Sequence, residues 1–172
     1  MAVTLITGGV KSGKSTWALR YAEERGTRRL FIATATAHDD EMRARIARHQ
    51  EDRGRRWVTR EEPRDIAGVI DQLQSDYDVL LIDCLTMWVS NLMTLYKEKE
   101  KDIADACAHL FSVLSGTANR IVFVTNEVGM GIIPADPLSR TYQRILGRLN
   151  ADIAGLSDEV FVMLSGIAQR IK

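Results

Sequence analysis

A glycine-rich loop near the start of the chain constrains its fold more than any other feature. The stretch GGVKSGKST covers residues 8–16 and directly follows the apolar run Val3–Thr7. It fits the pattern G-x-x-x-x-G-K-[ST] at every fixed position, with its lysine at Lys14 and its hydroxyl at Ser15. Glycines allow several backbone N–H groups to point at anionic oxygens, and the positive end of a following helix faces the same point. The sequence therefore predicts a strand, a phosphate-binding loop and a helix, the arrangement of P-loop nucleotide-binding proteins.

The polar side chains of this loop have distinct expected roles. Lys14 reaches the β- and γ-phosphates as a mobile positive charge, and Ser15 is a ligand for Mg²⁺. A carboxylate at a strand end near the magnesium is the second expected feature, and Asp83 closes the apolar run YDVLLID. Asp83 could instead cap a helix beginning at Cys84 or Leu85. We favour the magnesium-side role.

Apolar runs alternate with helical patterns along the chain. The apolar runs are Val3–Thr7, Leu30–Thr34, Val79–Asp83, Ile121–Thr125 and Val160–Ser165. The helical patterns are Ser15–Arg25, Asp39–Arg53, Asp65–Gln74, Leu85–Leu95, Ile103–Thr117 and Pro137–Leu156. This alternation predicts an α/β fold with a mostly parallel sheet and helices on both faces, because the runs are apolar enough to be buried on both sides. The closing stretch SGIAQRIK is a weak candidate for a short antiparallel final strand.

Bulk composition disfavours several classes of protein. A length of 172 residues suits one catalytic domain, residues 1–172. The 23 basic and 23 acidic residues give zero formal net charge, which disfavours a nucleic-acid partner because such surfaces carry excess Lys and Arg. No apolar run approaches the ~20 residues that span a bilayer, and the N-terminal strand is unlike a signal peptide, so we expect a cytoplasmic protein. Cys84 and Cys107 lack metal-ligand spacing and are expected to be structural thiols.

The loop alone does not select a reaction. An Asn-Lys-x-Asp stretch, which reads guanine in switch GTPases, is absent, so that class is disfavoured. A monofunctional P-loop kinase of another small metabolite stays open, and so does a nucleotide-dependent assembly or regulatory protein. The stretch TNEVGMGIIP, residues 125–134, follows the fourth apolar run and so belongs to the carboxyl edge of the sheet, where ligands of open α/β sheets bind. There, Asn126 and Glu127 could either contact a ligand or order the loop.

An arginine-rich helical segment carries the second informative signal. It reads HDDEMRARIARHQEDRGRRW, residues 38–57, with Asp39 as the expected N-cap. Met42, Ile46 and His49 share one helical face. A neutral imidazole beside a triphosphate can attack the α-phosphorus, expel pyrophosphate and hold the nucleotide through a labile P–N bond. On spacing alone, however, a lone histidine in such a helix is more often just a partly buried residue.

Four stretches together resemble a known family. They are TGGVKSGKS, FIATATAHDDEMRARIARHQEDRG, LLIDCLTMWVSNL and FVTNEVGMGIIPADPLSRTYQRILGRLN, and the resemblance covers nearly the whole chain. The order D-D-E-M-x-x-R-I-x-x-H, then T-N-E-V-G-x-G-I-x-P, resembles the bifunctional adenosylcobinamide kinase/adenosylcobinamide-phosphate guanylyltransferase family of cobalamin biosynthesis. The resemblance implies a RecA-like parallel sheet. It also implies a homo-oligomer, which in this family is a trimer with sites near the subunit boundaries.

The resemblance implies two reactions. A nucleoside triphosphate, ATP or GTP, first phosphorylates the aminopropanol hydroxyl of adenosylcobinamide. GTP then guanylylates the enzyme, and the GMP passes to adenosylcobinamide phosphate to give adenosylcobinamide-GDP. The guanylylated histidine of the family matches His49, which with Lys14 makes up the expected catalytic pair. Family members often carry two histidines in tandem, and the first of these is Arg48 here.

The resemblance also implies a set of GTP-contacting residues. These are Gly8, Gly9, Val10, Lys11, Ser12, Gly13, Lys14 and Ser15, then Thr34, Ala35 and Thr36, then Gln50, Glu51, Asp52 and Arg53 in the turn after the histidine, and finally Glu61 and Asp83. Mg²⁺ is expected at Ser15 and Asp83. One loop could serve both reactions, because it would grip the departing pyrophosphate in guanylylation and the transferred group in the kinase step.

Overall fold

The computed structural model describes residues 2–36, 40–97 and 99–172, and within residues 41–55 it describes only some of the side chains. The strands are β1 (Ala2–Gly8), β2 (Arg29–Ala33), β3 (Val58–Glu61), β4 (Val79–Asp83), β5 (Arg120–Val124), β6 (Glu159–Leu164) and β7 (Ile167–Arg170). The helices are α1 (Lys14–Glu23), α2 (Asp40–Arg53), α3 (Ile66–Leu73), α4 (Leu85–Leu95), α5 (Glu100–Gly116) and α6 (Pro137–Leu156). Two short 3₁₀ helices, η1 (Gly54–Arg56) and η2 (Gln74–Asp76), complete the described elements.

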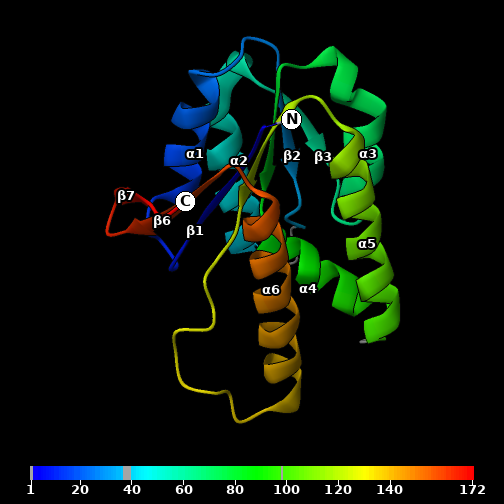
Figure 1. Ribbon diagram of the computed structural model, residues 1–172. Coiled ribbons are helices and arrows are strands. Elements are labelled where there is room, and N and C mark those ends of the chain that lie inside the picture. Colours follow the sequence, from blue (N-terminus) through cyan, green and yellow to red (C-terminus); the bar gives the residue numbers. More distant parts are fainter. Residues whose placement is uncertain (1, 37–39, 98) are drawn as a thin grey trace.

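All of these strands form one sheet in the order β3-β2-β4-β5-β1-β6-β7 (Figure 1). Neighbouring strands run parallel except β6 and β7, which are antiparallel. The predicted α/β fold with a mostly parallel sheet is therefore confirmed, and the closing stretch does form an antiparallel strand. Parallel strands end at the same edge, so the loops after β1, β2, β3, β4 and β5 meet there.

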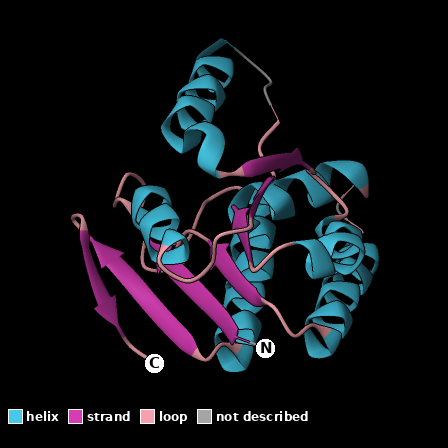
Figure 2. Cartoon of the chain, turned by 90° about the horizontal axis from the view of Figure 1, so that it is seen from above, coloured by secondary structure: helices cyan, strands magenta, loops and turns pink. Residues whose placement is uncertain are grey.

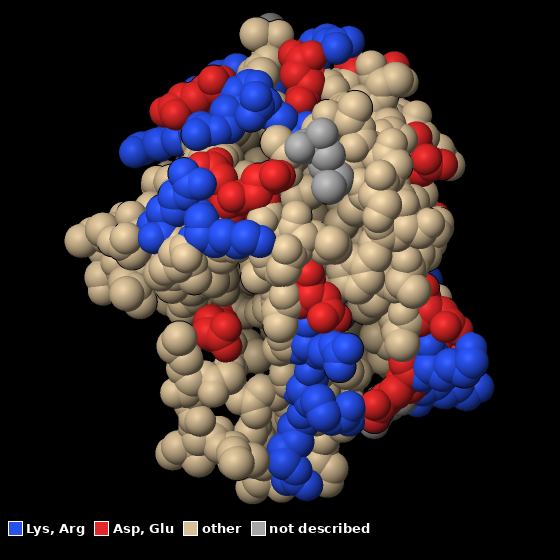
Figure 3. Space-filling view, viewed as in Figure 1, with Lys and Arg blue, Asp and Glu red and all other residues tan. Residues whose placement is uncertain are grey.

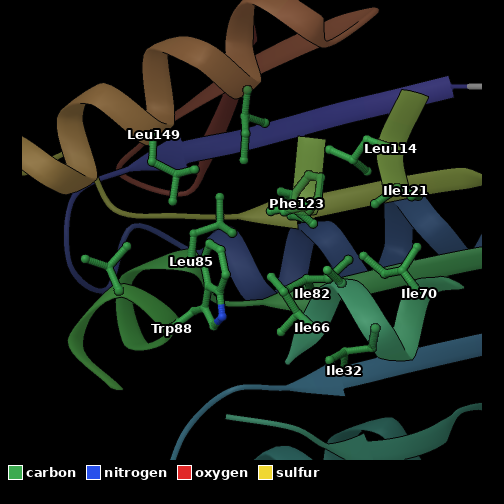
Figure 4. Packing of buried hydrophobic residues seen from close by; sticks show 14 of the residues in the cluster. Ile32, Ile66, Ile70, Ile82, Leu85, Trp88, Leu114, Ile121, Phe123 and Leu149 are labelled. Carbon is green, nitrogen blue, oxygen red and sulfur yellow. The ribbon is translucent and has the colours of Figure 1, made fainter. Parts of the chain in front are cut away.

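Helices cover both faces of the sheet, as predicted. One face packs against α3, α4, α5 and α6 in a large apolar cluster that includes Ile82, Leu85, Trp88 and Phe123 (Figure 4). The other face packs against α1, where Ala18, Tyr21 and Ala22 join side chains of the central strands. Burial on both faces explains why β1, β4 and β5 read as nearly continuous apolar runs. Among the described residues, no helix combines the length and apolarity that crossing a bilayer requires.

One strand was not expected from the sequence. β3 reads VTRE, and all four of its residues are exposed. It pairs only with β2 and forms an edge of the sheet. An edge strand with both faces open to solvent needs no apolar run, so the pattern used to find the other strands could not detect it.

Helix α2 stands away from the layers that cover the sheet. Figure 2 shows it beyond β3, apart from the helices that pack on the two faces. The predicted N-cap of this helix, Asp39, lies outside the described residues, and the described helix begins at Asp40. On the surface, basic and acidic side chains are interspersed, with basic side chains gathered along α6, which carries Arg140, Arg144 and Arg148 (Figure 3).

Candidate active site

Two glycines shape the turn between β1 and α1. Gly8 ends β1 with a φ of 147°, and a Cβ added there would lie 2.5 Å from the carbonyl oxygen of Met163. Gly13 precedes α1 in the left-handed conformation, with a φ of 91°. A side chain is excluded by contact at the first position and disfavoured by backbone conformation at both. Both glycines that the motif requires therefore have a steric reason in this chain.

The lysine of the motif is turned into its own loop. Lys14 is the first residue of α1 and is only 7% exposed. Its Nζ donates to the carbonyl oxygen of Gly9 at 2.5 Å and to Oγ of Ser12 at 3.4 Å. The first N–H groups of a helix have no intrahelical acceptor, so the turn combines a nearly buried cation with helix donors. This combination suits a phosphate group.

The remaining loop residues form its rim. Gly9, Val10 and Lys11 are exposed, and Lys11 has a φ of 56°. Ser12 is nearly buried, and its carbonyl oxygen accepts the N–H of Gly166 at 3.1 Å, which ties the loop to the turn between β6 and β7. Ser15 follows Lys14 in the first turn of α1 and is half-buried.

Asp83 lies at the carboxyl end of β4, with β5 between its strand and β1. Two strand spacings of about 4.8 Å separate β4 from β1. The N-cap of α4 is Cys84, and no side chain caps that helix, so the helix-capping alternative for Asp83 is wrong. A hydroxyl from Ser15 and a carboxylate from Asp83 are hard oxygen donors of the kind that Mg²⁺ prefers, so the residue types fit the ion.

Cys84, directly after Asp83, is a half-buried thiol. Burial is the main cause that raises its pKa to about 11, and the charge of the Asp83 carboxylate adds to the effect. Burial likewise raises the pKa of Cys107 to about 11. Both cysteines are free, as expected for structural thiols.

Thr34 joins the ends of β2 and β4 and does not face solvent. Its side chain is fully buried, donates to the carbonyl oxygen of Cys84 and accepts the Cys84 N–H, each at 2.7 Å. Asn91 of α4 donates to the carbonyl oxygens of Thr34 at 2.7 Å and Pro63 at 3.0 Å. Asn91 therefore joins the segments after β2 and β3. Sequence reasoning missed it, although a lone amide inside the apolar pattern Leu85–Leu95 was the available signal.

A cleft of about 430 Å³ opens between α2 and the segments that follow β2 and β3. It is lined by Ala35, Thr36, Arg43, Ala47, Gln50, Glu61 and Pro63. Nε2 of Gln50 donates to Oε1 of Glu61 at 3.3 Å across this cleft. Four residues expected to contact GTP, which are Ala35, Thr36, Gln50 and Glu61, thus come together here. We call this region the α2 cleft.

Side chains in the last turn of α2 lie in different environments. Glu51 is exposed, whereas Arg53 is 4% exposed and its guanidinium stacks 3.8 Å from the ring centroid of Phe31. Arg53 therefore packs on the sheet and does not line the cleft. His49 lies in α2 by its backbone, but its side chain and that of Asp52 fall outside the described part of the structure.

The phosphate loop and the α2 cleft lie on the same edge of the sheet but at different strands. α2 leads through η1 into β3, and the phosphate loop follows β1. Four strand spacings of about 4.8 Å lie between β3 and β1, which amounts to roughly 19 Å. Within one chain, the expected residues therefore form two groups and not one.

The segment after β5 lies beside the phosphate loop. The N–H of Glu127 donates to the carbonyl oxygen of Gly8 at 3.1 Å. The Asn126 N–H donates to Oγ1 of Thr86 at 2.9 Å, and Asn150 of α6 donates to the Asn126 carbonyl oxygen at 3.0 Å. Neither Gly129 nor Gly131 has a positive φ. Their role is therefore not to relieve strain in the left-handed region.

The fold and the loop geometry define the class of protein, a P-loop NTPase of the RecA-like type. The chain matches a solved RadB recombinase with a TM-score of 0.53 and 16% identity, over 94% of this chain and 73% of that one. It matches an ATPase of a bacterial type III secretion system with a TM-score of 0.59 and 11% identity, over 94% of this chain and 50% of that one. At such identities the likeness concerns the fold alone.

Within that class, the chain belongs to the family described as cobinamide kinase / cobinamide phosphate guanyltransferase, which matches residues 4–171. It is 37% identical to the bifunctional adenosylcobalamin biosynthesis protein CobU of Salmonella typhimurium, over 98% of both chains. It is 38% identical to the bifunctional protein CobP of Pseudomonas aeruginosa, over 98% of this chain and 96% of that one. The resemblance drawn from the sequence is confirmed.

Proposed function

We propose that this chain is a bifunctional enzyme that phosphorylates adenosylcobinamide and then guanylylates the product. In the first reaction, ATP or GTP gives its γ-phosphoryl group to the aminopropanol hydroxyl. In the second, GMP moves from GTP to adenosylcobinamide phosphate, which yields adenosylcobinamide-GDP for cobalamin biosynthesis. The observation that carries this proposal is the family match over residues 4–171 together with the intact phosphate loop.

Each region of the carboxyl edge has a proposed role. Gly8–Ser15 holds the triphosphate, Lys14 offsets charge on the β- and γ-phosphates, and Ser15 and Asp83 hold Mg²⁺. The bound Mg²⁺ supplies further positive charge beside the phosphates. Residues of the α2 cleft contact the guanosine, and the hydrogen-bonded pair Gln50 and Glu61 is among the polar groups that line it.

His49 is the proposed nucleophile of the second reaction. Its neutral imidazole attacks the α-phosphorus of GTP, the bond to the β-phosphate oxygen breaks, and pyrophosphate leaves with the electron pair. An oxygen of adenosylcobinamide phosphate then attacks the same phosphorus and releases the imidazole. Pyrophosphate carries the developing charge, so the loop cations assist this step as well as the kinase step.

The proposal needs α2 and a phosphate loop to approach one another. They are four strand positions apart in one chain, so α2 either moves toward its own loop or meets the loop of a neighbouring copy. Family resemblance supports a single catalytic domain of residues 1–172 that assembles as a cytoplasmic homotrimer. His49→Ala and Lys14→Ala proteins should each be deficient in labelling by GTP. Mixing them separates the two routes, because only transfer between copies restores labelling.

Covalent labelling tests the function directly. The protein is incubated with GTP labelled at the α-phosphorus, denatured, and assayed for label that is labile in acid and stable in base, as a phosphoramidate is. His49→Ala should lose this label and keep most of the phosphorylation of adenosylcobinamide. His109→Ala, which alters an exposed histidine of α5, is the matched control and should keep both.

The same assay decides against the main alternative. A monofunctional kinase of another metabolite would transfer no label to the protein and none to adenosylcobinamide phosphate. If a folded His49→Ala protein lost both activities equally, the division of labour between the imidazole and the phosphate loop would be wrong.

A further inference from the structure

The proposed reactions differ in their need for a proton acceptor. In guanylylation, a neutral imidazole attacks through its lone pair, and in GMP transfer the attacking phosphate is already anionic near neutral pH. In the kinase step the nucleophile is an alcohol. Its O–H bond must break as the new O–P bond forms and the nucleoside diphosphate leaves with the electron pair of the β,γ-bridge. A carboxylate positioned to take that proton would serve the kinase step alone.

Few carboxylates of the described residues lie at the carboxyl edge near the phosphate loop. Glu61 ends β3, the far edge strand, and Glu62 follows it. Oε1 of Glu62 accepts the N–H groups of Arg64 and Asp65 at 2.9 Å each. Asp83 is the proposed magnesium ligand. Glu127 follows β5, the strand directly beside β1, and none of the roles above uses it.

The backbone of Glu127 is attached to the phosphate loop itself. The ladder between β1 and β5 continues past both strands, with the N–H of Thr125 donating to the Ile6 carbonyl oxygen at 3.0 Å and that of Glu127 donating to the Gly8 carbonyl oxygen at 3.1 Å. Between them, Asn126 is held by Thr86 and Asn150. Contacts from three elements therefore fix this short segment beside the first residue of the loop.

The carboxylate of Glu127 is half-buried and oriented by its own turn. Oε1 accepts the N–H of Gly129 at 2.7 Å. Within the described part of the chain, no hydrogen bond to Oε2 occurs. One oxygen thus holds the side chain while the other remains able to accept a proton.

The loop that begins at Glu127 presents an apolar surface. Met130, Ile132 and Ile133 are 85%, 95% and 76% exposed, and Figure 1 shows this segment as an extended strap beside α6. The hydroxyl of adenosylcobinamide is carried by a large macrocycle with apolar faces. A surface of this kind, continuous along the chain with Glu127, suits such a carrier.

We propose that Glu127 is the general base of the kinase step, whose carboxylate takes the proton of the acceptor hydroxyl as that oxygen attacks the γ-phosphorus. This inference rests on the proposed function and adds a catalytic residue to one of its two reactions. The proton goes to Glu127, the phosphoryl group goes to the alcohol oxygen, and the nucleoside diphosphate leaves.

The test compares the two reactions in one variant. Glu127→Gln keeps an oxygen that can accept the Gly129 N–H but cannot take a proton. General-base catalysis is worth about 10²–10⁴-fold. We therefore expect kcat for phosphorylation of adenosylcobinamide to fall by roughly that factor, with the KM for the nucleotide unchanged. The rate of α-labelling by GTP, and of GMP transfer to adenosylcobinamide phosphate, should stay within about twofold of the wild-type rate.

Two further variants keep the outcome decisive. Glu127→Ala should regain kinase activity on addition of sodium formate, a small carboxylate, whereas Glu62→Gln, the same change at a carboxylate that only holds backbone, should leave the kinase rate unchanged. Equal loss of kinase and labelling in Glu127→Gln, or an unchanged kinase rate, would overturn the assignment. If the wild-type protein itself does not phosphorylate adenosylcobinamide, it is the proposed function that fails.

Discussion

The phosphate loop and the α2 cleft share one edge of the sheet and are built in opposite ways. The loop follows a strand that is paired on both sides, by β5 and β6, and its lysine is nearly buried. The α2 cleft is formed around β3, which is paired on one side only and exposed along its whole length. The first region is part of the central sheet, whereas the second is attached to its margin.

This difference matches what each half of the proposed chemistry requires. A phosphate cradle gains from fixed donors, because donors that are already aligned cost no reorganisation during the reaction. A nucleophile that must first reach a phosphorus and then release it to a second substrate gains from a position that can change. The edge of a sheet, with few packing contacts, is where such a change costs least.

Replacement of Lys14 should produce the largest effect. Loss of one preorganised donor beside developing charge costs about 10²–10³-fold in rate. Lys14→Ala should therefore lower both phosphorylation of adenosylcobinamide and α-labelling by GTP by roughly this factor. Steady-state kinase assays and labelling rates measure the two.

The control is an exposed lysine outside the proposed site. Lys101 lies in α5 and pairs with Asp105 at 2.6 Å on the surface, so Lys101→Ala should change both rates by less than about threefold. If guanylyl transfer survived in Lys14→Ala, the two reactions would not share the phosphate loop. The loop and the α2 cleft would then be two independent sites.

Arg53 tests whether the end of α2 is firmly anchored. Its guanidinium lies 3.8 Å from the centroid of the Phe31 ring, and Trp57 packs edge-on against the same ring at 6.2 Å. Arg53→Ala should lower the free energy of unfolding by about 2 kcal/mol, through lost stacking and packing. Urea unfolding measures this.

Arg56 supplies the comparison for that variant. It is a more exposed arginine three residues later that pairs with Glu23, so Arg56→Ala should cost less than about 1 kcal/mol. Equal effects of the two changes would mean that Arg53 does not anchor the helix to the sheet.

The sequence predicted the central half of the molecule well for a physical reason. β1, β4 and β5 are buried on both faces, so their apolar runs are long and clear, and the loop motif needs its glycines at fixed spacing. Asp83 could be placed at a strand end because the run before it is unmistakable. Local pattern and tertiary environment agree in this half.

The region around β3 and α2 was harder to predict, because its sequence does not show which side chains pack on the sheet and which face solvent. β3 has no apolar pattern, and the guanidinium of Arg53, one of the residues proposed to contact GTP, stacks on Phe31. The hydroxyl of Thr34, another of these residues, bonds the backbone of Cys84. Motif resemblance marks a position along the chain, whereas side-chain direction depends on packing partners far away in sequence.

Glu61 tests whether the α2 cleft reads the base. A carboxylate can accept hydrogen bonds from both N–H groups on the Watson–Crick edge of guanine. Loss of a charge-assisted hydrogen bond costs about 1.5 kcal/mol or more, which is roughly tenfold in affinity. Glu61→Gln should therefore raise the GTP concentration that gives half-maximal labelling by about tenfold and leave the kinase KM for adenosylcobinamide unchanged. An unaltered labelling curve would remove Glu61 from the site.

The thiol beside Asp83 tests the rigidity of the central region. Burial raises the pKa of Cys84 to about 11, so its thiolate fraction at pH 8 is roughly 100-fold below that of an ordinary cysteine. Alkylation of the folded protein by iodoacetamide should therefore be slow at pH 8 and rise toward pH 11. Mass spectrometry with Cys107→Ser protein isolates this site, and urea-denatured protein gives the unprotected rate. Fast alkylation at pH 8 would mean that the end of β4 opens readily, and the contrast between a fixed phosphate cradle and an adaptable margin would no longer hold.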